Sequence, residues 1–127
     1  MSTPTHALNW FEIPVRDLDR AQRFYEQVLQ RALTREPLGP ELTLAVFPHD
    51  QAQGAGGCLM AGGPLQPAAQ GTLVYLDAGP RLDDSVARVA GAGGRVLQPR
   101  VDLPDGMGAF VHIEDPEGNR VGLHAMA

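Results

Sequence analysis

The sequence predicts an α+β fold in which each half of the chain contributes a strand, a helix and three further strands. Segments of period two and of helical period occur in the same order in both halves. Fifteen glycines and eleven prolines fall between these segments, which is typical of many short elements. A length of 127 residues fits one domain. We therefore expect a single domain over 1–127, with one module at about 6–62 and the other at about 70–126.

The first module opens with a predicted strand at residues 7–15, because its side chains alternate between two faces. One face carries Phe11, Ile13 and Val15, and the other carries Leu8, Trp10, Glu12 and Pro14. A helix follows, since Asp17 can cap its first turn and apolar residues recur at positions 18, 21, 24, 25, 28 and 29. The apolar run 42–47 lies between prolines and predicts a buried strand. Residues 58–61, flanked by glycine, predict another.

The second module repeats this order from residue 72. Residues 72–77 predict a strand, and Gly79-Pro80 predicts a helix that has proline at its first position. The helix has an apolar stripe at Leu82, Val86, Val89 and Ala90, and glycines at 91, 93 and 94 end it. Three strands are then expected at 95–97, 109–114 and 120–125, with a turn at 115–119 joining the last two.

Composition and charge exclude several classes of function. The chain is 43% hydrophobic and 20% charged, as in soluble globular proteins, and its net charge of -5 with scattered basic residues argues against nucleic-acid binding. No run approaches the length of a membrane-spanning helix. The single cysteine, Cys58, is expected to be a small buried hydrophobic residue, and the N-terminus lacks an apolar leader. We therefore expect a cytoplasmic protein.

Two stretches of the chain resemble the vicinal oxygen chelate superfamily, which includes glyoxalases, bleomycin resistance proteins and dioxygenase-like proteins. They are NWFEIPVRDLDRAQRFYEQVL near the N-terminus and FVHIEDPEGNRVGLH near the C-terminus, with Gly-Gly after the second helix between them. The resemblance implies two βαβββ modules whose mixed sheets curl in a barrel-like manner around a cavity for a small organic molecule. It also implies a homodimer.

The same resemblance places the family's metal-ligand positions on residues that cannot serve. They fall on Trp10, on Gly122 and near Gly71, none of which offers the lone pair that a catalytic metal requires. The sequence therefore predicts no metal and no other cofactor, and it argues against glyoxalase I activity. A divalent metal at a relocated site stays open as an alternative, because Glu12, His112 and His124 all lie on the strand face that points away from the helices.

Glu12 and His112 are the candidate catalytic residues. A carboxylate in the middle of a strand is costly unless it is paired or hydrated, so Glu12 either bonds a backbone group or an arginine such as Arg100 or Arg120, or faces the cavity with a raised pKa. His112 is either a hydrogen-bonded structural residue or an acid–base group oriented by Glu12.

Four further residues are candidates for ligand binding: Trp10, Tyr75, Phe110 and His124. The aromatic rings could stack on a flat ligand, or they could only fill the space that a metal occupies in relatives. His124 lies near the C-terminus, where a solvated role is the alternative.

Three functions remain open at this point. The first is metal-free binding of a small organic molecule in the cavity. The second is a lyase or isomerase that uses a relocated metal, or Glu12 and His112 as acid and base. The third is an accessory subunit with a vestigial cavity. The sequence alone names no ligand.

Overall fold

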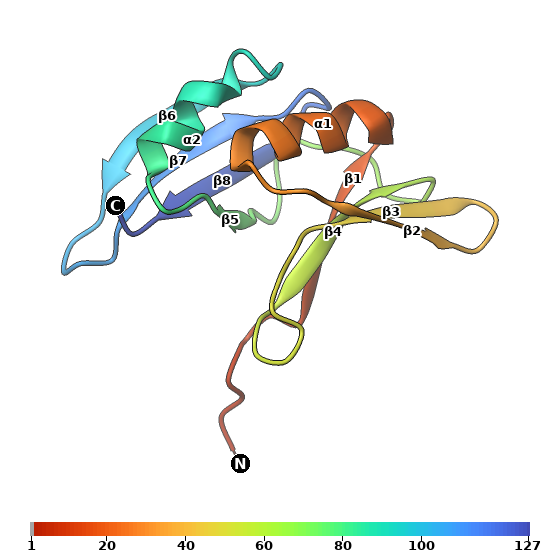
Figure 1. The fold of residues 1–127 in the computed structure, drawn as a ribbon, viewed down its shortest axis with the longest axis horizontal. Coiled ribbons are helices and arrows are strands. Elements are labelled where there is room, and N and C mark those ends of the chain that lie inside the picture. Colours follow the sequence, from red (N-terminus) through yellow and green to blue (C-terminus); the bar gives the residue numbers. More distant parts are fainter. Residues whose placement is uncertain (1) are drawn as a thin grey trace.

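The computed structural model describes residues 2–127 and confirms the two-module α+β fold (Figure 1). The first module consists of β1 (Trp10–Val15), α1 (Leu18–Leu29), β2 (Thr34–Leu38), β3 (Leu42–Val46) and β4 (Gly56–Ala61). The second consists of β5 (Tyr75–Asp77), α2 (Leu82–Val89), β6 (Arg95–Asp102), β7 (Ala109–Glu114) and β8 (Arg120–Ala125). No helix among residues 2–127 has both the length and the apolar content needed to cross a membrane.

Each module forms its own four-stranded mixed sheet. The strand orders are β1-β4-β3-β2 and β5-β8-β7-β6, so the first strand of each module pairs in parallel with the last one. All other pairs are antiparallel. Figure 1 shows the two sheets splayed apart below the two helices. One chain therefore provides two curved sheets, each with one face turned away from the helices, and the sheets do not close into a barrel.

The helices and the inner faces of both sheets share one hydrophobic core. All six apolar positions predicted for the first helix are buried. Alternate residues of β1, β7 and β8 join them, namely Ile13, Val15, Val111, Ile113, Val121 and Leu123. Full burial of an aliphatic side chain of this size contributes about 1.5–3 kcal/mol. The alternation that buries these residues also directs their neighbours in sequence to the opposite face of each sheet.

Two details of the predicted elements were wrong. Of the three strands expected after the first helix, the sequence did not locate β2, Thr34–Leu38, because its five residues are all exposed and show no alternation of polarity. It is an edge strand that pairs only with β3. The second helix begins at Leu82 with Arg81 as its N-cap, so Pro80 precedes the helix rather than opening it. Its buried stripe uses Ser85, whose hydroxyl donates to the Ala78 carbonyl, while Ala90 is exposed.

The predicted turn at 115–119 ties the second module to the first. The Glu117 carboxylate accepts hydrogen bonds from the backbone N–H groups of Arg16 and Asp17 and forms an ion pair with Arg20. These donors lie where β1 ends and α1 begins. The Glu117 side chain is fully buried, although Arg20 is half-exposed. An acidic group there also complements the positive end of the helix dipole.

Asn119 and Asp115 extend this junction. The Asn119 amide donates to the Pro14 carbonyl at 2.8 Å and accepts from the Ala68 N–H at 3.0 Å. Inside the core, the Asp115 carboxylate accepts a hydrogen bond from the Tyr25 hydroxyl at 2.7 Å. The turn therefore contacts β1, α1 and the connection between the modules through side chains that are all buried.

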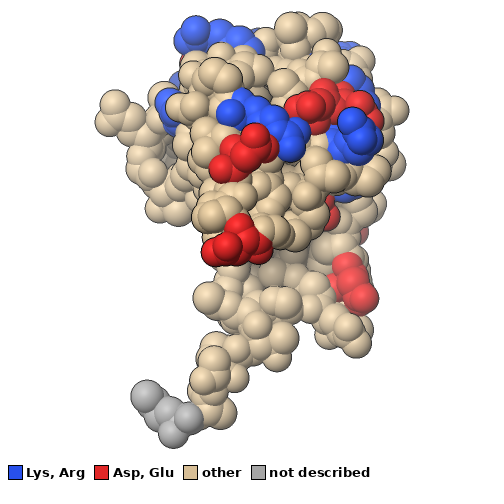
Figure 2. Space-filling model, turned by 90° about the vertical axis from the view of Figure 1, so that its left-hand side faces the viewer, with Lys and Arg blue, Asp and Glu red and all other residues tan. Residues whose placement is uncertain are grey.

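The arginines are dispersed among acidic residues. On the face drawn in Figure 2, blue and red side chains lie next to one another over the second module instead of gathering into a basic patch. Arg100, for example, pairs with Asp83 at 2.9 Å and with Asp102 at 2.8 Å. Such exposed pairs contribute little to stability.

Replacing Glu117 by Gln is expected to lower the free energy of unfolding by about 1.5–3 kcal/mol at neutral pH, because the buried charged acceptor is lost. Burial raises the pKa of Glu117, but the N–H groups of Arg16 and Asp17 and the Arg20 guanidinium together hold it below its ordinary value. The stabilisation is therefore complete above that ordinary value and is lost as the pH falls through the lower folded value. Urea unfolding from pH 7 to pH 3 measures this difference.

The control for this experiment is Glu114→Gln, which removes a partly exposed pair with Arg95 and is expected to cost less than about 1 kcal/mol. Asp115, whose pKa is raised chiefly by burial, is present in both proteins, so its titration cancels to first order in the comparison. Equal losses for the two variants, or a Glu117→Gln effect that does not change with pH, would contradict a stabilising role for Glu117.

Candidate functional site

Several of the predicted site residues meet on the face of the second sheet that points away from the helices. Tyr75 lies on β5, and Phe110 and His112 lie on β7. Between them runs β8, where Gly122 is paired with Tyr75 on one side and with His112 on the other. The neighbours of these residues, such as Val111 and Leu123, belong to the core. Strand alternation therefore places all three side chains on the open face.

Gly122 allows Tyr75 to reach across the sheet. A Cβ atom at position 122 would lie 2.3 Å from the Tyr75 ring, so any other residue there would displace the ring. Tyr75 lies across β8 and contacts both aromatic groups of β7, with ring centroids 5.6 Å from Phe110 and 5.5 Å from His112. Both pairs are edge-to-face, the arrangement that aromatic quadrupoles favour. We call Tyr75, Phe110, His112 and Arg120 the aromatic cluster.

A hydrogen-bond chain fixes the protonation of His112. Arg120 on β8 approaches the His112 Nδ1 atom with its Nε at 3.2 Å and its Nη2 at 3.0 Å. A guanidinium can only donate, so Nδ1 must be the acceptor and carries no proton. In a neutral imidazole the proton is then on Nε2, which lies 2.7 Å from the Tyr75 hydroxyl oxygen. His112 therefore donates to Tyr75.

Burial, and then the charge of Arg120, lower the pKa of His112 below its ordinary value. The imidazole is consequently neutral at pH 7. Protonation of Nδ1 would replace an accepted hydrogen bond by repulsion from the guanidinium. Arg120 itself has no carboxylate within 4.0 Å among residues 2–127, so its charge is balanced by no ion pair there.

His124 lies beside the aromatic cluster but has a structural partner. It is opposite Phe110 in the β7–β8 register, and its Nε2 atom lies 2.7 Å from the Met107 carbonyl oxygen. Because a carbonyl only accepts, Nε2 carries the proton in this bond. His124 thus fastens the connection between β6 and β7 to the sheet.

Glu12 and Trp10 lie on the other sheet. Both are exposed on the face of β1 that points away from the helices, and Trp10 contacts His49 edge-to-face at 6.1 Å. The arginines suggested as partners of Glu12 are engaged elsewhere, Arg100 with Asp83 and Asp102 and Arg120 with His112. That suggestion was wrong. Among residues 2–127, Glu12 forms no hydrogen bond or ion pair through its side chain, and none joins it to His112.

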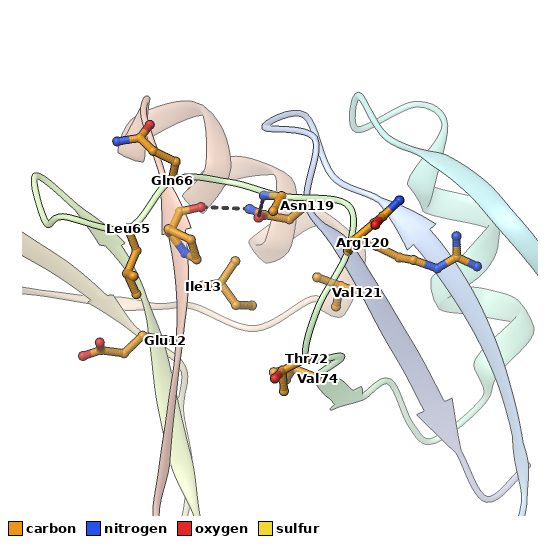
Figure 3. Close-up of a pocket in the computed structure, with 12 residues that line it drawn as sticks. Glu12, Ile13, Leu65, Gln66, Thr72, Val74, Asn119, Arg120 and Val121 are labelled. Atoms are coloured by element: carbon orange, nitrogen blue, oxygen red, sulfur yellow. Dashed lines mark hydrogen bonds between the residues drawn. The ribbon is translucent and has the colours of Figure 1, made fainter.

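Figure 3 shows why a pocket between the modules does not unite these groups. The Glu12 carboxylate extends to one side and the Arg120 guanidinium to the other. The pocket has a volume of about 320 Å³, and Ile13, Val74 and Val121 form apolar walls. Asn119 lies at its end, already bonded to the Pro14 carbonyl. Glu12 and Arg120 line this pocket from opposite sides, so the carboxylate and the guanidinium are not brought together there.

Cys58 is fully buried, as the sequence predicts. It pairs with Glu12 in the β1–β4 register. Burial, and then the Glu12 charge, raise the pKa of the Cys58 thiol to about 11. The thiol is therefore protonated at neutral pH and is a poor nucleophile.

The metal positions that the sequence resemblance implies do not carry suitable donors within one chain. Trp10 offers no lone pair, and the Tyr75 ring covers Gly122. The alternative donors are divided, because Glu12 is on the first sheet and the His124 Nε2 atom is bonded to Met107. Within the part of the chain that the structure describes, no group of three or more His, Cys, Asp and Glu side chains is placed to hold a metal ion.

The sequence did not indicate the role of Arg120. The role of Arg120 follows from the strand register that the 115–119 turn imposes. This register pairs Glu114 with Arg120 and His112 with Gly122, so Arg120 and His112 lie on the same face of the sheet. Position in the sequence alone does not reveal this pairing, since it depends on the register that the turn imposes.

Comparison with known families gives one match. Residues 7–123 match the model of the Glyoxalase/Bleomycin resistance protein/Dioxygenase superfamily. Comparison with curated proteins gave no match.

Several solved structures share the fold. Glyoxalase I from Zea mays is 21% identical with a TM-score of 0.68, and the alignment covers 92% of this chain and 45% of that chain. A glyoxalase/bleomycin resistance protein from Streptomyces sp. CB03234 is 21% identical with a TM-score of 0.67, covering 93% and 99%. TnmS3, an antibiotic binding protein from the same organism, is 22% identical with a TM-score of 0.65, covering 94% and 95%. This chain thus spans less than half of the maize enzyme.

The His112 tautomer can be checked directly by nitrogen-15 NMR of the imidazole. We expect Nε2 to show the signal of a protonated nitrogen and Nδ1 that of an unprotonated one, with a pKa below the ordinary value of about 6.5. Replacing Arg120 by Gln should raise this pKa, because a positive charge is removed. His124 serves as the control, since no arginine bonds to it. A proton on Nδ1 at pH 7, or a pKa unchanged in Arg120→Gln, would contradict the hydrogen-bond chain.

Proposed function

We propose that this chain, which belongs to the Glyoxalase/Bleomycin resistance protein/Dioxygenase superfamily, binds a small organic molecule at the aromatic cluster without the help of a metal. The observation that carries the proposal is the exposure of Tyr75, which is 47% accessible although its ring lies over Gly122 and contacts both Phe110 and His112. Binding sites for small molecules combine such apolar, aromatic surface with a few fixed polar groups. Here the polar groups are the Tyr75 hydroxyl and Arg120.

The rigidity of the cluster supports binding. Tyr75 is positioned by Gly122 below it, by two ring contacts and by the bond from His112. A surface held in its binding geometry loses little conformational entropy when a ligand arrives. The antibiotic binding protein TnmS3 has the same fold, which supports a binding role for this chain without naming its ligand.

We further propose that the chain forms a homodimer through the outward face of the first sheet. The outward face of the first sheet carries an apolar area that is uncovered within one chain, with Glu12 and Glu36 on the same face. The area includes Leu38 at 55% and Trp10 at 40% exposure, with Leu42, Leu44 and Val46 beside them. Apolar surface of this kind marks interaction sites. The alignment with maize glyoxalase I covers less than half of that enzyme's chain. Two copies of this chain therefore approach the length of one such enzyme, which supports a dimer. The protonated, buried Cys58 fits a reducing compartment such as the cytoplasm.

The alternative function is a lyase or isomerase that uses Glu12 and His112 as base and acid, or binds a relocated metal. It is favoured by Glu12, an exposed carboxylate on an outward sheet face. Because Glu12 and His112 lie on different sheets, this chemistry requires the second copy to bring them together. A metal content of about one equivalent per chain in protein purified without chelators would favour the metal-dependent form over the main proposal.

The binding proposal is tested with naphthalene-2-carboxamide, a flat neutral probe. We expect saturable changes in the amide NMR signals of β5, β7 and β8, because the ring packs against Tyr75 and Phe110. Tyr75→Ala should weaken binding about tenfold or more, which corresponds to about 1.4 kcal/mol. Met126→Ala, which removes an exposed apolar side chain outside the cluster, should leave the affinity unchanged. Signals that change only elsewhere, or not at all, would exclude this site.

The dimer is tested by light scattering coupled to size-exclusion chromatography. We expect a mass twice that of one chain, and we expect Leu38→Glu to shift the protein toward the monomer because it places a charge in the apolar face. Met126→Glu is the matched control, because Met126 is 68% exposed and lies outside that face. A monomer at all concentrations would overturn the proposed second copy.

A further inference from the structure

The hydrogen-bond chain of the aromatic cluster decides what kind of ligand group it can receive. Arg120 donates to His112 Nδ1, and His112 Nε2 donates to the Tyr75 oxygen. The Tyr75 hydroxyl proton takes no part in that chain, and no acceptor among residues 2–127 receives it. Since Tyr75 is half-exposed on the open face, this proton is available to a ligand, and the cluster presents a hydrogen-bond donor beside an aromatic surface.

The charges around the cluster also favour a ligand group that accepts hydrogen bonds. Two acidic residues share this face, and each has its own arginine: Glu114 lies 3.2 Å from Arg95, and Asp77 lies 3.9 Å from Arg31. Arg120 is bonded instead to the neutral imidazole of His112. Its positive charge is therefore not balanced by an ion pair within residues 2–127. A cation held in place next to a hydroxyl donor attracts an anionic oxygen and repels a cationic group.

We infer that the ligand of the aromatic cluster is an aromatic molecule carrying an oxyanion, such as a carboxylate or a phenolate. The inference rests on the proposed function and adds the chemistry of the ligand to it. The ring packs against Tyr75 and Phe110, and the oxyanion accepts the Tyr75 hydroxyl proton within the field of Arg120. Arg120 acts on the ligand by its charge and, through His112, by orienting the Tyr75 hydroxyl.

The experiment compares three probes that share one ring and differ in one group: 2-naphthoate, naphthalene-2-carboxamide and 2-(aminomethyl)naphthalene. Dissociation constants are measured at pH 7 on the full chain, and the binding site is mapped by amide NMR. We expect 2-naphthoate to bind about tenfold more tightly than the carboxamide, because hydrogen bonds to charged groups are the stronger ones. The cationic amine should bind most weakly.

Two variants distinguish the contribution of the Tyr75 hydroxyl from that of the Arg120 charge. Tyr75→Phe keeps the ring and should remove most of the preference for 2-naphthoate while leaving carboxamide binding within about threefold. Arg120→Gln should reduce the same preference about tenfold. Arg81→Gln changes the net charge equally on α2, where Arg81 is exposed beside Asp84, and should leave the preference intact. The ratio of dissociation constants is the readout, because a general loss of fold lowers all three affinities together.

The possible failures are distinguishable. If all three probes bind at the cluster with similar affinity, or if Tyr75→Phe and Arg120→Gln leave the preference unchanged, the inference about the oxyanion is overturned while the proposed function stands. If no probe binds at the cluster, the proposed function itself fails.

Discussion

The buried Glu117 carboxylate is the interaction on which the arrangement of the two modules depends. It lies in the turn between β7 and β8, yet its hydrogen bonds reach the point where β1 ends and α1 begins. A buried carboxylate is stable only when donors surround it, so its three donors must hold their positions. Asn119 and Asp115 add bonds from the same turn to Pro14 and Tyr25. The most distant parts of the sequence are thereby fixed to one another.

The same turn also positions the residues of the aromatic cluster. By setting the register of β7 against β8, it places Gly122 opposite His112 and Arg120 two residues away on the same face. Tyr75 can then lie across Gly122 and accept a hydrogen bond from His112. The glycine at position 122 therefore makes room for the aromatic surface. The groups on this face can stack and form hydrogen bonds, and function on a shared fold is set by such local groups.

Much of this architecture is predictable from sequence because it rests on local periodicity. The spacing of apolar residues in α1 and the alternation in β7 and β8 identify those elements with their correct bounds. Strand β2 is exposed on both faces and carries no such pattern, so only its pairing with β3 defines it. Alternation also groups Tyr75, Phe110 and His112 on one face. The partner of Arg120 and the separation of Glu12 from His112 depend instead on register and on the packing of two sheets, which local patterns do not encode.

A crystal structure of the protein with bound 2-naphthoate tests the central claim most directly. The account predicts density for the ring against Tyr75 and Phe110, with a carboxylate oxygen within hydrogen-bonding distance of the Tyr75 hydroxyl and His112 still bonded to Arg120. Density in the pocket between the modules, along Ile13 and Val121, with the aromatic cluster empty, would contradict the claim.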